Sequence, residues 1–139
     1  MSLRVITVIF AIIALVACRS MGGVAINSEQ VSVSVGQKVS LDDRKIRKLR
    51  KLQTVETLHR YITHRLNKMD MGQTLKFDVT ITSYRIGFGR DHMGINVIVR
   101  ENGEVVQEFD EVETTGRSNP TAKLSKGLAR RIIDRVKGL

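Results

Sequence analysis

The spacing of apolar residues changes along this chain, and this change most constrains its fold. Val31, Val33 and Val35 alternate with serines, which predicts a strand with one buried face. Strands are predicted at residues 31–35, 75–81, 93–99 and 105–112. Apolar residues instead recur every three or four positions in residues 41–69 and 120–136, which predicts two helices with one apolar stripe each.

Every predicted helix and strand has one apolar side, and packing these sides together predicts the architecture. The chain should be α+β: a two-layer sandwich with two helices on one face of a four-stranded, mainly antiparallel sheet. The order is strand, helix, three strands, helix (β-α-β-β-β-α), and the long first helix is the crossover between the first two strands. The other face should be open and polar, with Ser32, Ser34, Lys76, Asp78, Thr80, Asn96 and Glu108.

Two irregularities are predicted within these elements. Ser40 should cap the first helix, which should bend or break between Leu52 and Thr54 because its apolar stripe shifts there. The apolar phase of the second strand slips near Ser83, which predicts a bulge that turns the following side chains outward or into a loop.

The hairpin between the last two strands can have two registers around its turn at Asn102 and Gly103. A two-residue loop would place Phe109 opposite Asn96 and split the apolar residues between the two faces. A three-residue loop ending at a left-handed Gly103 would place Phe109 opposite Ile95 instead, so we predict this second register.

The N-terminal segment has the anatomy of an export signal. Residues 5–16 carry no charge, Arg4 precedes them and Arg19 follows. An apolar run of about 13 residues is shorter than the roughly 20 that a membrane-spanning helix needs. The run ends in Leu15-Val16-Ala17-Cys18, which resembles the bacterial lipobox, where a branched apolar residue and two small residues precede a cysteine.

The lipobox resemblance implies that Cys18 is a lipidation site. In bacterial lipoproteins this thiol receives a diacylglycerol, the signal is cut before the cysteine, and the new amine is usually acylated. Cys18 is the only cysteine, so it has no partner for an internal disulfide. We expect a signal peptide (1–17), a flexible tether (18–30) and a single periplasmic α+β domain (31–139). A non-lipidated protein with an uncleaved single anchor is the alternative.

The lipobox and the element order together resemble the small outer-membrane lipoproteins of Gram-negative bacteria, which include the lipopolysaccharide-assembly lipoprotein. In these bacteria an aspartate directly after the lipidated cysteine retains a lipoprotein in the inner membrane. Arg19 stands at that position. The resemblance therefore implies a lipoprotein of the outer membrane that faces the periplasm and acts as a binding, scaffold or assembly-accessory protein.

The charge of the chain indicates the class of its partners. It has 23 Lys and Arg against 14 Asp and Glu, a net charge of +9, which favours anionic partners. An exported chain meets little nucleic acid, and 4% aromatic residues without any Trp provide no stacking platform for single strands. We expect the membrane, through the lipid on Cys18, and an envelope protein or anionic lipid as partners, and no nucleic acid.

The strongest candidate for a binding surface is the basic run at residues 44–51. On a helical wheel, five of its six cations lie within an arc of about 160° that faces away from the apolar residues of the run. Near a charged membrane each cation contributes about 1 kcal/mol to binding. The candidate residues for binding an anionic surface are Arg44, Arg47, Lys48, Arg50 and Lys51. A solvated helix face that only keeps the protein soluble is the alternative.

A second candidate surface follows the second predicted strand. Residues 84–90 combine aromatic and apolar side chains with arginines and glycines, a mixture typical of protein interfaces. The candidate interface residues are Tyr84, Arg85, Ile86, Phe88 and Arg90. An ordinary strand end with a long loop is the alternative.

The remaining polar residues favour binding over catalysis. His59 and His64 are five positions apart, about 140° on a helical wheel, so they do not share the face that zinc ligands need. A small envelope enzyme with a site near Asp91 and His92 is the alternative function. We expect no catalytic residue, no metal site and no cofactor. An acidic cluster in the last strand should protect an exposed sheet edge; its residues are Glu108, Asp110, Glu111 and Glu113.

Overall fold

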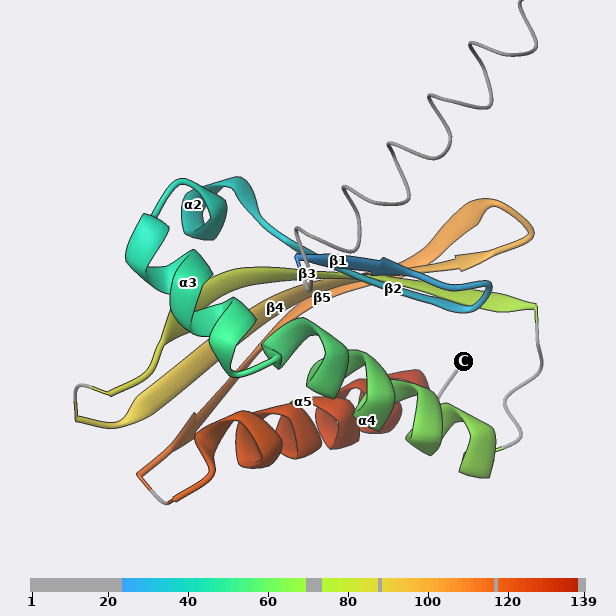
Figure 1. Cartoon of the computed structure of the whole chain (residues 1–139). Helices are drawn as coiled ribbons and strands as arrows, with labels where there is room; N and C mark the ends of the chain where they lie inside the picture. The colour runs from blue at the N-terminus through green and yellow to red at the C-terminus, as the bar shows by residue number, and fades with distance from the viewer. Residues whose placement is uncertain (1–23, 70–73, 88, 117, 138–139) are drawn as a thin grey trace, which may run out of the picture.

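The computed structural model describes residues 24–69, 74–87, 89–116 and 118–137, and these form an α+β sandwich (Figure 1). Five strands lie in one sheet in the order β1-β2-β3-β4-β5, with β2 and β3 parallel and the other neighbours antiparallel. The strands are β1 (Ala25–Asn27), β2 (Val31–Val35), β3 (Leu75–Arg85), β4 (Asp91–Glu101) and β5 (Glu104–Thr115). The helices are α2 (Gln37–Ser40), α3 (Asp43–Lys51), α4 (Thr54–Met69) and α5 (Pro120–Val136).

The core lies between one face of the sheet and the two long helices, α4 and α5, which run side by side beneath it (Figure 1). Most strand residues predicted to face inward are buried, among them Val31, Val33, Phe77 and Val79, whereas Val105 is 51% exposed. The apolar stripe predicted for the last helix is confirmed as well, because Leu124, Leu128, Ile132 and Val136 are fully buried. The α+β class and the helical crossover between two parallel strands are therefore confirmed.

The number of elements differs from the prediction of four strands and two helices. The tether predicted for residues 18–30 is wrong in its second half, because Ala25–Asn27 form the edge strand β1. β1 pairs antiparallel with β2, and Ile26 packs against the core. A strand of three residues is too short to show a periodicity in the sequence. It is recognised only by its pairing with the edge of β2. The predicted signal peptide, residues 1–17, lies outside the described residues.

The crossover predicted as one helix at residues 41–69 is divided into α3 and α4, and the short helix α2 precedes them. The predicted break is confirmed between Lys51 and Thr54, where Gln53 has a left-handed backbone with φ of 51°. The predicted cap is wrong, because Ser40 belongs to α2 and its hydroxyl donates to the carbonyl of Gln37. The backbone becomes extended only at Asp42, which caps α3 instead.

The hairpin between β4 and β5 differs from the predicted register. Its loop consists of Asn102 and Gly103 alone, with φ of 51° and 83°, which are the two positive values that a type I′ turn requires. The three-residue loop is therefore wrong. A register shift at the start of β5 adds one residue to that strand, and Phe109 consequently pairs with Val97 on the inner face. The bulge, and not the length of the loop, therefore places Phe109 on the same face as the apolar residues of β4.

The bulge predicted near Ser83 is confirmed, but its effect on the following side chains is opposite to the prediction. The register between β3 and β4 shifts between Ile81 and Ser83. After the shift Tyr84 pairs with Met93, and both side chains are buried. The additional residue compensates for the phase slip in the sequence, so the strand keeps its apolar side chains on the inner face.

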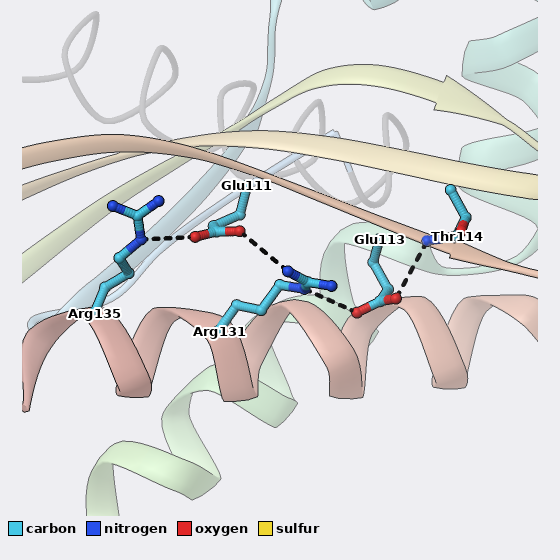
Figure 2. Close-up of polar contacts among 5 residues, drawn as sticks. All are labelled: Glu111, Glu113, Thr114, Arg131 and Arg135. Carbon is cyan, nitrogen blue, oxygen red and sulfur yellow. Dashed lines mark hydrogen bonds and ion pairs between the residues drawn. The ribbon is translucent and has the colours of Figure 1, made fainter.

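The sheet edge at β5 is covered on its inner face by ion pairs with α5 (Figure 2). Glu111 accepts a hydrogen bond of 2.8 Å from Nε of Arg135 and lies 3.6 Å from Arg131, which also binds Glu113 at 3.1 Å. The predicted acidic edge strand thus has two carboxylates turned toward a helix. Glu108 and Asp110 lie on the outer face, where both accept hydrogen bonds from Asn96.

Candidate functional site: a cationic crevice between α3 and the end of β3

The amino end of α3 is fixed by its cap, and the apolar residues of the helix decide which side faces outward. Oδ1 of Asp42 accepts hydrogen bonds from the backbone amides of Arg44 and Lys45 at 3.1 and 3.2 Å. Leu49 is the fully buried residue of the helix, and Ile46 is half-buried beside it. With these two side chains turned inward, most cations of α3 point to the solvent.

Lys48 joins α3 to the end of β3. Its Nζ donates a hydrogen bond of 2.6 Å to the backbone carbonyl of Ile86, a residue 38 positions further along the chain. From the other side, Oδ1 of Asp91 accepts a hydrogen bond of 2.8 Å from the amide of Gly87. The turn that follows β3 is therefore held by a cation from α3 and a buried carboxylate from β4.

These contacts border a crevice of about 270 Å³, which combines the two surfaces that the sequence suggested separately. Four cations and one carboxylate line it, together with an aromatic and an aliphatic side chain: Arg44, Lys45, Lys48, Arg85, Asp42, Tyr84 and Ile86. Because four cations outnumber the single carboxylate, the net field in the crevice is positive. The arrangement suits an anionic group that carries apolar atoms beside it.

Tyr84 forms the inner wall of this crevice and is neutral at physiological pH. Its side chain is only 1% exposed, and burial raises the pKa of its phenol above the ordinary value of 10.0. The phenol hydroxyl lies 2.8 Å from the hydroxyl of Thr54 at the start of α4, and the two share a hydrogen bond.

The five cations predicted to bind an anionic surface do not all play the same part. Arg44, Arg47, Arg50 and Lys51 are exposed, whereas Lys48 is half-buried and donates to Ile86. Nε of Arg47 donates a hydrogen bond of 3.4 Å to the backbone carbonyl of Asp43, four residues earlier in α3. Four of the five cations are thus accessible to a ligand, and one connects two elements.

The segment predicted as a protein interface is less exposed than the sequence suggested. Tyr84 is buried and Ile86 is half-buried against the core, so the expectation of exposed apolar groups at these two positions is wrong. The bulge at Ser83 is the cause, since it returns the strand to its inward phase. Arg85 and Arg90 are exposed, and Phe88 lies outside the described residues.

The residues of the alternative enzyme site do not face one another. Asp91 and His92 are consecutive in β4 and therefore point to opposite faces: Asp91 is buried toward the helices, and His92 lies on the open face. Nε2 of His92 is instead 2.7 Å from the hydroxyl of Ser83, a contact that depends on the bulge and that we did not predict. Within the described ranges, no carboxylate orients this imidazole as a catalytic triad requires.

The two histidines of α4 differ in their surroundings. His59 lies 3.0 Å from the hydroxyl of Ser28, and His64 is exposed. The described residues contain no group of three His, Cys, Asp or Glu side chains that could hold a metal ion. No helix in the described part of the chain is long and apolar enough to cross a membrane. Cys18, the predicted lipidation site, lies outside the described ranges.

Comparison with known proteins gives similar solved structures but no sequence family. No family model matches the chain, and no curated protein matches its sequence. A Caulobacter crescentus CB15 protein, described as a lipoprotein by inference, is 11% identical with a TM-score of 0.47, over 57% of this chain and 76% of its own. A minor lipoprotein from Acinetobacter baumannii is 8% identical with a TM-score of 0.41, over 79% and 93% of the two chains.

A third similar structure is the PelC dodecamer from Paraburkholderia phytofirmans. It is 12% identical with a TM-score of 0.40, over 81% of this chain and 92% of that one. TM-scores below 0.5 at these identities establish neither a shared fold nor a shared function. The function has to be argued from the residues of this chain.

Proposed function

We propose that this protein is a lipoprotein of the outer membrane, anchored through acyl chains on Cys18, whose periplasmic domain holds an envelope protein or an anionic lipid close to the membrane. The lipobox at residues 15–18 supports the anchor. Arg19, in place of an aspartate, supports the outer membrane as the location. Acyl chains on one cysteine provide firm anchoring because each buried methylene contributes about 0.8 kcal/mol and more than one chain is attached.

The observation that carries this proposal is the short distance along the chain from the lipobox to the folded domain. Six residues separate Cys18 from β1, which begins at Ala25. An extended chain spans at most about 3.6 Å per residue, so Ala25 would lie within about 25 Å of the lipidated cysteine. A domain on such a tether stays at the membrane surface, where a scaffold or an assembly accessory acts.

Binding is favoured over catalysis by the construction of the candidate site. The crevice presents fixed cations beside Tyr84 and Ile86, and this arrangement recognises charge and shape. Two serine–histidine pairs occur among the described contacts, Ser83 with His92 and Ser28 with His59, and both lie outside this crevice. A partner of anionic character therefore suits the domain better than a reacting substrate.

The N-terminus of the mature protein tests the proposal directly. The wild-type chain and a Cys18→Ser variant are produced in a Gram-negative host, and the N-terminal peptide of each is analysed by mass spectrometry after membrane fractionation. We expect a wild-type peptide that begins at Cys18 and carries a diacylglycerol and an N-acyl chain, in the outer-membrane fraction. The serine variant should carry neither.

An intact N-terminus in the inner membrane would instead support a non-lipidated anchor and contradict the proposal. An Arg19→Asp variant is the control for location. If the resemblance to the sorting rule holds, this variant is lipidated equally well but stays in the inner membrane. Unprocessed wild-type protein in the cytosol would remove the basis for an envelope role altogether.

A further inference from the structure

Leu41 is an apolar side chain that the fold leaves almost entirely in water. It is 76% exposed, more than any other large apolar residue that the structure describes. Leu41 ends the one-turn helix α2 and directly precedes Asp42, the cap of α3, so it occupies the tip of a tight turn between two helices. An apolar group at such a tip gains free energy when it leaves water.

Cations surround this tip. Lys38 precedes Leu41 in α2, and Arg44 and Arg47 follow it in α3, all of them exposed. Residues 38–51 include seven Lys and Arg side chains and two Asp side chains, a net charge of +5. Of the two carboxylates, Asp42 is occupied by the amides of α3. An exposed leucine among cations is the pattern of segments that lie at the surface of an anionic membrane.

The tip also follows the end of β2 that pairs with the start of β1, where the segment that would carry the lipid anchor joins the domain. Ala25, the first residue of β1, pairs with Ser34 near the end of β2. Two residues later Gly36 leads into α2, so the end of β2 that pairs with the start of β1 is also the end that leads to the α2–α3 turn (Figure 1). The β4–β5 hairpin, with its turn at Asn102 and Gly103, extends from the opposite end of the sheet (Figure 1).

We propose that Leu41 and the exposed cations of α3 form a second contact with the membrane that carries the anchor. Leu41 enters the boundary between headgroups and acyl chains, and Arg44, Arg47, Arg50 and Lys51 bind the phosphates of anionic phospholipids. The location of this contact rests on the proposed anchoring at Cys18. Together the anchor and the tip hold the domain in one orientation, with the β4–β5 hairpin directed away from the membrane.

Because Cys18 is the only cysteine and would be acylated, an added cysteine provides a single free thiol for labelling. We would label Leu41→Cys with an environment-sensitive fluorophore in the mature full-length protein, reconstituted in vesicles of phosphatidylcholine with phosphatidylglycerol. Val105→Cys is the matched control, since Val105 is 51% exposed and lies beside the distant hairpin. We expect quenchers fixed in the bilayer to reduce the fluorescence of the label at position 41 at least twofold and to leave the label at position 105 unchanged.

The role of charge is tested by a second pair of variants that lose the same number of cations. Replacement of Arg44, Arg47, Arg50 and Lys51 by Gln should abolish the quenching at position 41, because each cation contributes about fivefold to binding near a charged surface. The control replaces four exposed cations of α4 and α5 by Gln and should leave the quenching intact: Lys68, Lys123, Lys126 and Arg130. High salt and vesicles of pure phosphatidylcholine should both reduce the quenching.

Each outcome separates this inference from the proposed function. Equal quenching at positions 41 and 105, or none at position 41 in a protein whose lipid is confirmed by mass, would overturn the membrane contact and leave the lipoprotein proposal intact. If the mass shows no lipid, the lipoprotein proposal fails, and the same labels in a Cys18→Ser background, which again leaves a single free thiol, still decide with anionic vesicles whether Leu41 enters a membrane. Loss of quenching in the α4–α5 control would show that overall charge, and not this tip, drives the binding.

Discussion

The hydroxyl groups of Thr54 and Tyr84 share a hydrogen bond of 2.8 Å, which joins the first residue of α4 to the end of β3. Both side chains are buried, at 0% and 1% exposure. Water cannot replace either partner in such an environment, so the bond ties the wall of the crevice to the helical layer.

Tyr84→Phe should destabilise the fold. The substitution keeps the ring but leaves the hydroxyl of Thr54 without this partner, at a cost of about 1–2 kcal/mol in the free energy of unfolding. Urea denaturation followed by circular dichroism measures the change. Tyr61→Phe is the control, because Tyr61 is half-buried and its described contact is with the guanidinium of Arg60 over its ring. Equal losses in both variants would contradict the role of the Thr54 bond.

The raised pKa of Tyr84 predicts a loss of stability at alkaline pH. In the unfolded chain the phenol ionises near 10.0, whereas in the folded protein burial keeps it protonated to higher pH. The contribution of this group is therefore complete below that value and is lost as the pH rises through the folded pKa. Denaturation curves between pH about 9 and about 11 should show a steeper decline for the wild type than for Tyr84→Phe. Parallel declines would be inconsistent with this assignment.

Lys48 and Lys51 should differ in their effect on stability although both belong to the basic run. Lys48→Gln loses the hydrogen bond of 2.6 Å to the carbonyl of Ile86, and we expect a cost of about 1 kcal/mol. Lys51 is exposed, so Lys51→Gln should change the free energy of unfolding by less than about 0.5 kcal/mol. Thermal denaturation of the two variants compares them at the same change in charge.

Gly127 is the position in α5 where the helix meets the carboxylate of Glu113. An alanine in a helix is normally more stable than glycine by about 1 kcal/mol, but here its Cβ would overlap the side chain of Glu113 and displace it from Arg131. We expect Gly127→Ala to give no gain in the wild type and a gain of about 1 kcal/mol in a Glu113→Ala background. A gain of the same size in both backgrounds would show that the contact has no energetic consequence.

The turn at Asn102 and Gly103 should be sensitive to substitution. Gly103 has a φ of 83°, and an L-residue with a side chain pays about 1–2 kcal/mol in the left-handed region. Gly103→Ala should therefore lower the unfolding free energy by about that amount. Gly116→Ala is the control, because a Cβ there meets no atom within 4 Å and no positive φ is required. Chemical denaturation of the two variants measures the change in the free energy of unfolding for each.

The parts of the fold that were predicted correctly depend on patterns within one element. Strict alternation in residues 31–35 identified β2, and the helical spacing of Leu124, Leu128 and Ile132 identified α5. The break near Gln53 was also visible, because a shift of the apolar stripe is a local signal. In each case the residues that define the element are neighbours in the sequence.

The parts that were missed depend on contacts between distant residues. The inward turn of Glu111 in β5 depends on the β4–β5 bulge and on Arg135, 24 positions further along the chain. The crevice exists because Lys48 reaches Ile86, and the sequence shows both residues without showing that they meet. Leu41 looked like the first residue of an amphipathic helix, and only the capping by Asp42 shows that it stands outside that helix.

The parallel pairing of β2 with β3 has a consequence for how the chain acquires its structure. Thirty-nine residues, 36–74, separate these two strands, so this pair closes a much longer loop than the β3–β4–β5 meander does. Loop closure of this length delays formation of the contact. We therefore expect the C-terminal meander to form first and the N-terminal hairpin to join it last, an order that pulsed hydrogen exchange during refolding would reveal. The strand β1, the first described element of the domain, would then be the last to become ordered.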